Sequence, residues 1–182
     1  MNLNSETQLV QAAQNGHLES FGALYKRYHS PMVALAYSLL ADRDLAEDAA
    51  QEVFAIACGD MTSLKRKDKF GAWLAGICRN VARQILRSKG KRVALNDVQQ
   101  FAENEDNKEH RADLIRRAVW RLRSSERELI VLRYYDNMPY EQIAQVLDIS
   151  IQAVNGRLIR AKRKLAKYLK RDSLTGGDYE TP

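Results

Sequence analysis

The chain has 182 residues, 45% of them apolar, and a formal net charge of +6. The apolar content excludes global disorder, and the length allows one ordinary domain or two small ones. The basic residues form two blocks around an acidic stretch at residues 96–113, a distribution that favours a polyanionic partner.

The first predicted helices lie near the N-terminus. Helix-forming residues predominate along the chain and proline occurs only three times, so nearly all of the structure is expected to be helix. Ser5 and Gln8 form a capping-box pattern that opens a helix, which Gly16 ends. A second helix is expected over residues 18–28, and Pro31 is placed where a separate, strongly apolar helix begins.

Two longer helices follow. Asp42 and Asp44 cap a helix that ends at Gly59. Residues 60–69 are polar and basic and have no apolar periodicity, so they are predicted to form a loop. The apolar residues after this loop recur at helical spacing, which predicts a helix over residues 70–87.

An acidic segment separates two predicted domains. Residues 93–110 are polar and poor in large apolar side chains, as expected of an interdomain linker. The first domain then comprises residues 1–92, the second residues 111–171, and residues 172–182 form a polar, frayed tail. The predicted fold class is all-α, with two small helical domains joined by a flexible linker.

The second domain is predicted to end in a helix-turn-helix. Its first helix covers about residues 112–122, and Ser124 or Ser125 caps a second helix that ends before a turn at residues 136–138. Pro139 then begins a short helix. A tight turn at Asp148 follows, and a long helix capped by Ser150 runs to about residue 171. A short helix, a three-residue turn and a longer capped helix form the helix-turn-helix pattern.

The last helix has an apolar face and a polar, basic face. Asp148 stands where glycine is usual in such turns, but aspartate tolerates the left-handed conformation better than most residues. Gly156 in a helix interior costs roughly 1 kcal/mol relative to alanine, and Ile159 points away from the core. Both features fit a surface that approaches a nucleic-acid groove, although a solvated basic helix is the alternative. The predicted DNA-reading residues are Gln152, Asn155, Gly156, Arg157, Ile159, Arg160 and Arg163.

The first domain carries two further polar faces. The helix that begins after Asp42 has an acidic face, which is either solvated or a protein-docking surface. On the helix over residues 70–87, Ala72 and Gly76 give way along one line to Arg79, Arg83 and Arg87, a pattern that suits a phosphate backbone. Trp73 lies on the same helix, and we expect it to belong to the core rather than to stack on bases.

Cysteine and histidine usage indicates neither a metal site nor an enzyme. Cys58 and Cys78 form no CxxC motif and are expected to be reduced thiols in a cytosolic protein. His17, His29 and His110 are scattered, without a nucleophile or carboxylate pair at a telling spacing. No cofactor and no metal are therefore expected. The N-terminus has no signal-peptide pattern and no apolar run reaches membrane length, so a cytoplasmic protein without membrane insertion is expected.

Three segments together resemble a bacterial family, the extracytoplasmic-function (ECF) sigma factors. LAEDAAQEVF resembles their core-polymerase-binding segment, and FGAWLAGICRNVARQIL resembles their promoter-melting, minus-ten-reading helix. ERELIVLRYYDNMPYEQIAQVLDISIQAVNGRLIRAKRKL resembles their region 4 helix-turn-helix. The segments occur in the order and spacing of the family and cover nearly the whole chain except its tail.

The resemblance implies a sigma factor that binds core RNA polymerase, recognises one class of promoter DNA and promotes strand opening. It also implies an anti-sigma factor as a partner, and a linker that passes near the active site and RNA exit path of the polymerase. The departures from the family pattern are Cys58, where tryptophan is frequent, and Gly156, where serine is common. The implied polymerase contacts are Asp48, Gln51, Glu52 and Phe54. The implied minus-ten contacts are Asn80 and the loop residues Lys65, Arg66 and Lys67. The minus-ten site predicted here also includes Arg79, Arg83 and Arg87, which the pattern along their helix indicates. The implied minus-thirty-five contacts are Asn155, Gly156, Ile159 and Arg160.

Two other functions stay open at this stage. A response-regulator-type transcription factor ends in a similar helix-turn-helix, but it needs a preceding α/β domain, and nothing in residues 1–95 is typical of strands. A helical adaptor that binds only protein would not need the basic faces. Strand content would favour the first alternative, and failure to bind polymerase and DNA together would favour the second.

Overall fold

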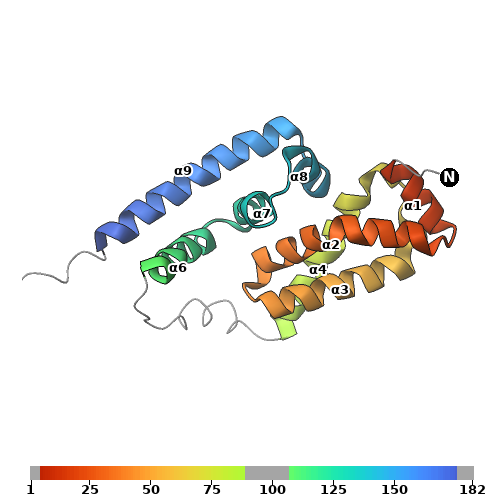
Figure 1. Cartoon of the computed structure of the whole chain (residues 1–182), viewed down its shortest axis with the longest axis horizontal. Coiled ribbons are helices and arrows are strands. Elements are labelled where there is room, and N and C mark those ends of the chain that lie inside the picture. The colour runs from red at the N-terminus through yellow and green to blue at the C-terminus, as the bar shows by residue number, and fades with distance from the viewer. Residues whose placement is uncertain (1–4, 89–106, 176–182) are drawn as a thin grey trace, which may run out of the picture.

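The computed structural model describes residues 5–88 and 107–175. Within these ranges the chain forms helices and short turns and contains no strand. The prediction of an all-α protein is thus confirmed, and the α/β domain of a response regulator is absent from residues 5–88. The helices form two groups, α1–α4 and α6–α9, which lie side by side (Figure 1). In the described part of the chain, none of the helices is long and apolar enough to cross a membrane.

Four helices make up the first group, and local capping explains where they begin. In the predicted capping box, the Ser5 hydroxyl accepts from the Gln8 amide while the Gln8 side chain accepts from the Ser5 amide. The Asp42 carboxylate caps α3 by accepting from the Leu45 amide at 3.0 Å. The bounds are Glu6–Gln14 for α1, Leu18–Leu40 for α2, Arg43–Asp60 for α3 and Phe70–Ser88 for α4.

The predicted helix break before Pro31 is wrong, because α2 continues through it. Proline inside a helix costs roughly 3 kcal/mol, since it removes a backbone donor and crowds the preceding turn. Pro31 is itself buried, and the large side chains Met32, Leu35 and Leu40 beyond it are fully buried. Burial contributes roughly 1.5–3 kcal/mol for each such side chain, which offsets the proline.

The second group begins earlier than its predicted boundary. Helix α6 covers Asn107–Trp120, so the last residues assigned to the linker are helical. Arg123, rather than Ser124 or Ser125, holds the N-cap position of α7, where its amide donates to the Glu126 carboxylate. A π-helical turn, Val131–Tyr135, follows α7 directly. The other bounds are Ser124–Ile130 for α7, Tyr140–Leu147 for α8 and Ile151–Thr175 for α9. Residues 93–106 of the predicted linker and 176–182 of the predicted tail lie outside the described residues.

The helix-turn-helix has the predicted turn. Asp148 adopts the left-handed conformation, with φ 53° and ψ 50°, and its amide donates to the Ala144 carbonyl. The Ser150 hydroxyl accepts from the Ala153 amide at 3.1 Å and caps α9. Val154 and Leu158 on α9 are buried, as their spacing predicted. The turn therefore fixes which face of α9 is left for solvent.

The two groups pack against each other through α2, α4, α7 and α8, and their buried apolar residues form one continuous cluster. Tyr37 of α2 packs edge-to-face on Trp120 and stacks on Tyr135, with ring centroids 6.1 and 5.3 Å apart. The Arg127 guanidinium of α7 donates to the Ser38 carbonyl near the end of α2. The sequence contained no indication of this packing.

Candidate nucleic-acid interface

The predicted recognition face of α9 is open to solvent. Six of its seven predicted residues are exposed, and Gly156 is half-buried. Ile159 is 43% exposed, which is unusual for a large apolar side chain on a helix with an apolar core face. A Cβ added to Gly156 would meet only the Arg160 guanidinium, at 3.8 Å. The exposed residues of this face are Gln152, Asn155, Arg157, Ile159, Arg160 and Arg163.

The stripe on α4 is only partly open. Asn80, Arg83 and Arg87 are exposed, and the Arg83 guanidinium donates to the Asn80 side-chain oxygen at 3.3 Å. Arg79 differs from them, because its guanidinium donates to both carboxylate oxygens of Glu128 on α7, at 3.3 and 3.0 Å. The predicted minus-ten contact at Arg79 is thus occupied by the second domain. Trp73 is partly buried and packs on the core, as expected.

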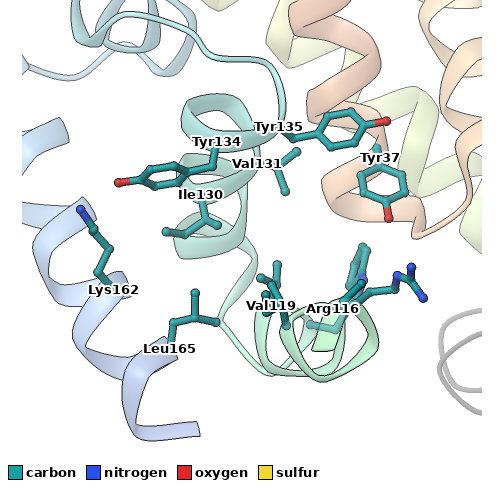
Figure 2. Close-up of a pocket in the computed structure, with 12 residues that line it drawn as sticks. Tyr37, Arg116, Val119, Ile130, Val131, Tyr134, Tyr135, Lys162 and Leu165 are labelled. Atoms are coloured by element: carbon teal, nitrogen blue, oxygen red, sulfur yellow. The ribbon is translucent and has the colours of Figure 1, made fainter. Parts of the chain in front are cut away.

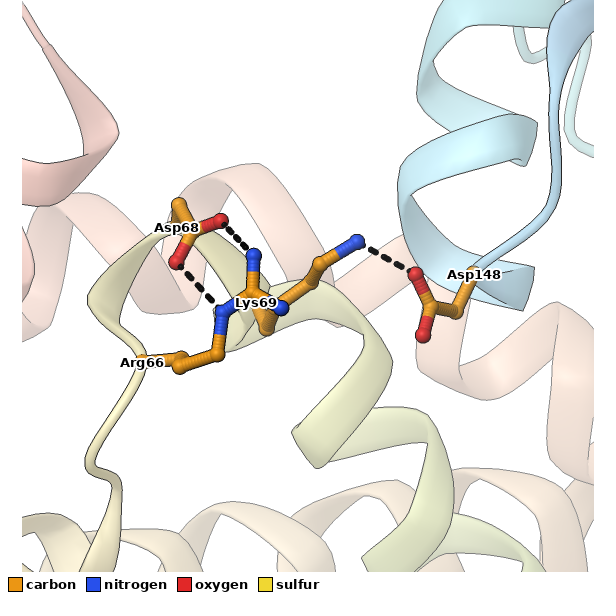
Figure 3. Close-up of polar contacts among 4 residues, drawn as sticks. All are labelled: Arg66, Asp68, Lys69 and Asp148. Atoms are coloured by element: carbon orange, nitrogen blue, oxygen red, sulfur yellow. Dashed lines mark hydrogen bonds and ion pairs between the residues drawn. The ribbon is translucent and has the colours of Figure 1, made fainter.

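The basic loop before α4 contains a local ion pair. Lys65 and Arg66 are exposed and Lys67 is half-buried. Arg66 donates twice to Asp68, with the shorter distance 2.7 Å (Figure 3). This hydrogen bond raises the pKa of Arg66 and lowers that of the Asp68 carboxyl. Both side chains of this pair are largely exposed, at 69% and 55%, so it is a weak surface pair.

The acidic face of α3 is exposed at three of the four predicted polymerase contacts. Asp48, Gln51 and Glu52 face solvent. Phe54 does not share this face: it is 4% exposed and its ring packs against those of Tyr25, at 4.7 Å, Phe21 and His29. The helical period turns Phe54 into the core, so it supports the position of α3, and its role as a direct polymerase contact stays a prediction.

An apolar pocket lies where α2, α6, the π-helical turn and α9 meet. Its volume is about 560 Å³. The second domain supplies most of its lining residues, and the first domain contributes Tyr37 (Figure 2). Three of its lining residues are more than 40% exposed, namely Ile115, Tyr134 and Tyr135. Sequence reasoning missed this pocket, because it depends on the packing of the two domains. Among the described residues, no group of histidine, cysteine and acidic side chains is placed to hold a metal ion.

Sequence reasoning also missed the polar side chains between the domains. Glu128 is 7% exposed although it is charged, and it pairs with Arg79. The Lys69 ammonium pairs with the Asp148 carboxylate at 2.5 Å (Figure 3). One signal was present, since Glu128 directly precedes an apolar run and buried charges require partners. The spacing of residues in the sequence did not identify Arg79 as the partner of Glu128.

Comparison with known proteins places both helical groups in known families. Residues 24–92 match the family model described as Sigma-70 region 2, and residues 112–165 match that described as Sigma-70, region 4. The RNA polymerase sigma-H factor of Pseudomonas aeruginosa is 27% identical over 180 residues, covering 90% of this chain and 93% of that protein. The ECF RNA polymerase sigma-E factor of Escherichia coli K12 is 27% identical over 173 residues, covering 86% and 90%.

Solved structures agree on the fold. The structure of CnrH in complex with the cytosolic domain of CnrY is similar, with a TM-score of 0.62 and 27% identity over 92% of this chain and 98% of that one. The sigma factor RpoE from Bartonella quintana, solved with the anti-sigma factor NepR, has a TM-score of 0.55 and 23% identity over 84% and 98%, a likeness of fold. The first helical group carries region 2 and the second carries region 4. The chain therefore belongs to the sigma-70 family, in its extracytoplasmic-function subfamily, and is a promoter-recognising initiation factor of RNA polymerase rather than an enzyme.

Proposed function

We propose that this sigma factor works through three faces on separate helices. The acidic face of α3 binds core RNA polymerase. The stripe on α4, with the basic loop before it, holds the minus-ten element. The exposed face of α9 reads the minus-thirty-five element. The observation that carries this proposal is the α9 face, where amides, arginines and an unburied isoleucine lie together directly after the helix-turn-helix turn.

The chemistry of the α9 face suits the major groove. The Asn155 and Gln152 amides offer both a donor and an acceptor, as adenine requires, and Arg160 offers the paired donors that guanine accepts. Ile159 offers an apolar contact to a thymine methyl group. Farther along α9, Lys167 is exposed and offers a point charge suited to phosphate. The early part of α9 thus provides specificity and the later part provides general affinity.

The test of this assignment compares Arg160→Ala with Lys167→Ala. We expect Arg160→Ala to cost roughly 1–3 kcal/mol of promoter binding and to relax the base preference at one position. Lys167→Ala should weaken binding less, and equally on every sequence. The measurement is sequencing of transcripts made by core polymerase with each variant on genomic DNA. Two sequence-independent losses would show that α9 is not the reading helix.

The docking role of α3 has its own test. Asp48→Lys with Glu52→Lys reverses two exposed charges, so it should abolish co-purification with core polymerase while leaving the fold intact. The matched control is Glu19→Lys with Glu141→Lys, which changes the net charge equally at exposed sites elsewhere. Undiminished co-purification of the first variant, or equal loss in both, would contradict a specific docking face.

Two expectations concern the cellular setting. We propose that an anti-sigma factor regulates this chain, since the similar proteins CnrH and RpoE were solved with a bound protein, named as an anti-sigma factor in the second case. We also propose that the chain acts in the cytoplasm, where core polymerase transcribes DNA. Purification of the tagged chain from cells before and after stress, with identification of a stoichiometric protein that polymerase displaces, tests the first. Fractionation of the same cells tests the second.

A further inference from the structure

One side chain of α1 holds the beginning of the basic loop before α4. The chain leaves α3 through a short 3-10 turn, Met61–Ser63, and Leu64 then leads into the basic residues. The Gln14 side-chain amide donates to the Met61 carbonyl at 3.0 Å and to the Leu64 carbonyl at 2.9 Å. A glutamine amide has two N–H donors, so this one group binds both ends of the turn.

The two residues that Gln14 binds are also anchored in the core. Met61 is 4% exposed and Leu64 is 6% exposed, and both belong to the buried apolar cluster. Lys65 and Arg66, directly after them, are exposed. A carbonyl group near the core that loses its donor costs more free energy than one in open solvent. The direction in which the chain passes from the buried Leu64 to the exposed Lys65 therefore depends on the Gln14 amide.

The other end of the loop is supported from α1 as well. The Tyr28 hydroxyl of α2 donates to the Glu6 carboxylate of α1, and the Tyr28 ring packs edge-to-face on Phe70, the first residue of α4. Helix α1 also packs against the 3-10 turn Lys67–Lys69 at the end of the loop. Figure 1 shows α1 beside the segment that leads into α4. Helix α1 thus supports the loop at both ends, although none of the predicted DNA contacts belongs to it.

We propose that Gln14 is a positioning residue for the minus-ten site, which holds the basic loop in the one arrangement that discriminates among bases. The proposal rests on the assignment of this loop to the minus-ten element. Gln14 acts through the backbone of the loop, by way of the two carbonyls. Discrimination is a difference between two affinities, so a loop that can shift accommodates a wrong base nearly as well as the right one. A loop held in place cannot adapt in this way.

The experiment compares Gln14→Glu with Gln11→Glu in the full chain. Both residues lie on α1 and both changes add one negative charge, but Gln11 is exposed and its side chain donates to Asn15 at the end of the same helix. A carboxylate at position 14 cannot donate to either carbonyl, whereas Gln14→Lys keeps a donor group and serves as the rescue variant. Gln14→Asn has an amide too short to bind both carbonyls, and it repeats the test if circular dichroism shows that Gln14→Glu is unfolded.

Two measurements separate the position of the loop from its function. Limited digestion with trypsin, followed by mass spectrometry, measures cleavage after Lys65, Arg66 and Lys67, and its rate follows the population of displaced loops. Transcription by core polymerase from promoters randomised in the minus-ten element, followed by sequencing of the transcripts, measures base preference. Promoters randomised in the minus-thirty-five element are the internal control, because the proposed function assigns that element to α9.

We expect Gln14→Glu to accelerate cleavage of the loop about tenfold, because two hydrogen bonds of ordinary strength correspond to a factor of this order in an equilibrium constant. The ratio of preferred to disfavoured minus-ten bases should fall by about the same factor. The minus-thirty-five preference should not change. Gln14→Lys and Gln11→Glu should resemble the wild type in both measurements.

Three results would overturn the proposal. The first is an unchanged cleavage rate or an unchanged minus-ten preference in Gln14→Glu. The second is an equal effect of Gln11→Glu. The third is an equal relaxation of the minus-ten and minus-thirty-five preferences, because Gln14 would then only stabilise the fold. Lys65→Ala with Lys67→Ala tests the proposed function separately: an unchanged minus-ten preference in that variant would remove the loop from the DNA site, while the cleavage rates would still show whether Gln14 holds the loop.

Discussion

Gly71 is the position at which an added methyl group has the clearest consequence. A Cβ on Gly71 would lie 2.9 Å from Tyr28 Cε1, 3.0 Å from its hydroxyl oxygen and 3.2 Å from Cζ. Carbon atoms in contact are ordinarily about 3.5–4.0 Å apart. The Tyr28 ring is 3% exposed, its hydroxyl donates to Glu6, and Phe70 packs edge-to-face on it at 5.3 Å. The ring therefore cannot move away without breaking other contacts.

These contacts set the expected cost of Gly71→Ala. Overpacking of a filled core costs about 1–3 kcal/mol. Replacing glycine by alanine in a helix returns at most about 1 kcal/mol, and Gly71 is only the second residue of α4. We therefore expect a net loss of about 1–2 kcal/mol in the free energy of unfolding. The start of α4 and the basic loop before it should be displaced together.

Gly76 of the same helix provides the control. A Cβ at Gly76 has nothing within 4 Å, so Gly76→Ala should stabilise the chain by up to about 1 kcal/mol. Urea unfolding followed by circular dichroism measures both variants against the wild type. The reasoning is refuted if Gly71→Ala is as stable as Gly76→Ala. It is also refuted if Gly71→Ala costs the same in a Tyr28→Leu background, where the obstructing ring is gone.

Three further predictions concern single side chains. At pH 8 a maleimide should label Cys58 rapidly and leave Cys78 unreacted in the native chain, because burial raises the pKa of the Cys78 thiol to about 12; equal labelling rates would contradict this. The hydrogen bond from Lys164 lowers the pKa of Glu126. The stabilisation from this hydrogen bond is therefore present above the ordinary glutamate pKa of 4.5 and is lost as the pH falls through the lowered pKa. Urea titrations at several pH values should show a larger loss of stability on acidification in the wild type than in Glu126→Gln. Asn80→Ala should reduce abortive transcription on duplex promoter DNA, and a template already melted across the minus-ten region should recover the loss if Asn80 supports opening; full activity on both templates would remove Asn80 from the interface.

Local signals in the sequence were sufficient for most of the fold. Ser5, Asp42 and Ser150 cap helices as predicted because a cap depends on residues three positions apart. The left-handed turn at Asp148 follows from its place between two periodic helices. The exposed face of α9 follows from the 100° step between residues, so the helix-turn-helix and the exposure of this face were predictable, while the DNA-reading role of its residues stays a prediction.

The errors arose where distant residues decide the outcome. Pro31 is a local break signal, but the burial of the following turns depends on α3 and α4, which the local pattern does not contain. Phe54 was assigned to the polymerase surface through family resemblance, an assignment that stays a prediction; its burial depends on the rings of α2 that pack on it, which the pattern of α3 does not contain. Arg79 was expected to be open, and its partner Glu128 lies 49 residues away. Such pairs depend on tertiary packing, so the pattern of residues within α4 does not predict them.

The end of α2 depends on the domain that packs beside it. Its last turn contains no basic residue, although its carbonyls lack helical partners and concentrate negative potential. The Arg127 guanidinium supplies the missing positive charge at the Ser38 carbonyl from 89 positions away, while lying 4.1 Å from the centre of the Trp120 ring. The stability of the last turn of α2 therefore depends on its contact with the second helical group. Separation of the two helical groups would remove this charge from the helix end, and hydrogen exchange at the amides near Tyr37 should then become faster.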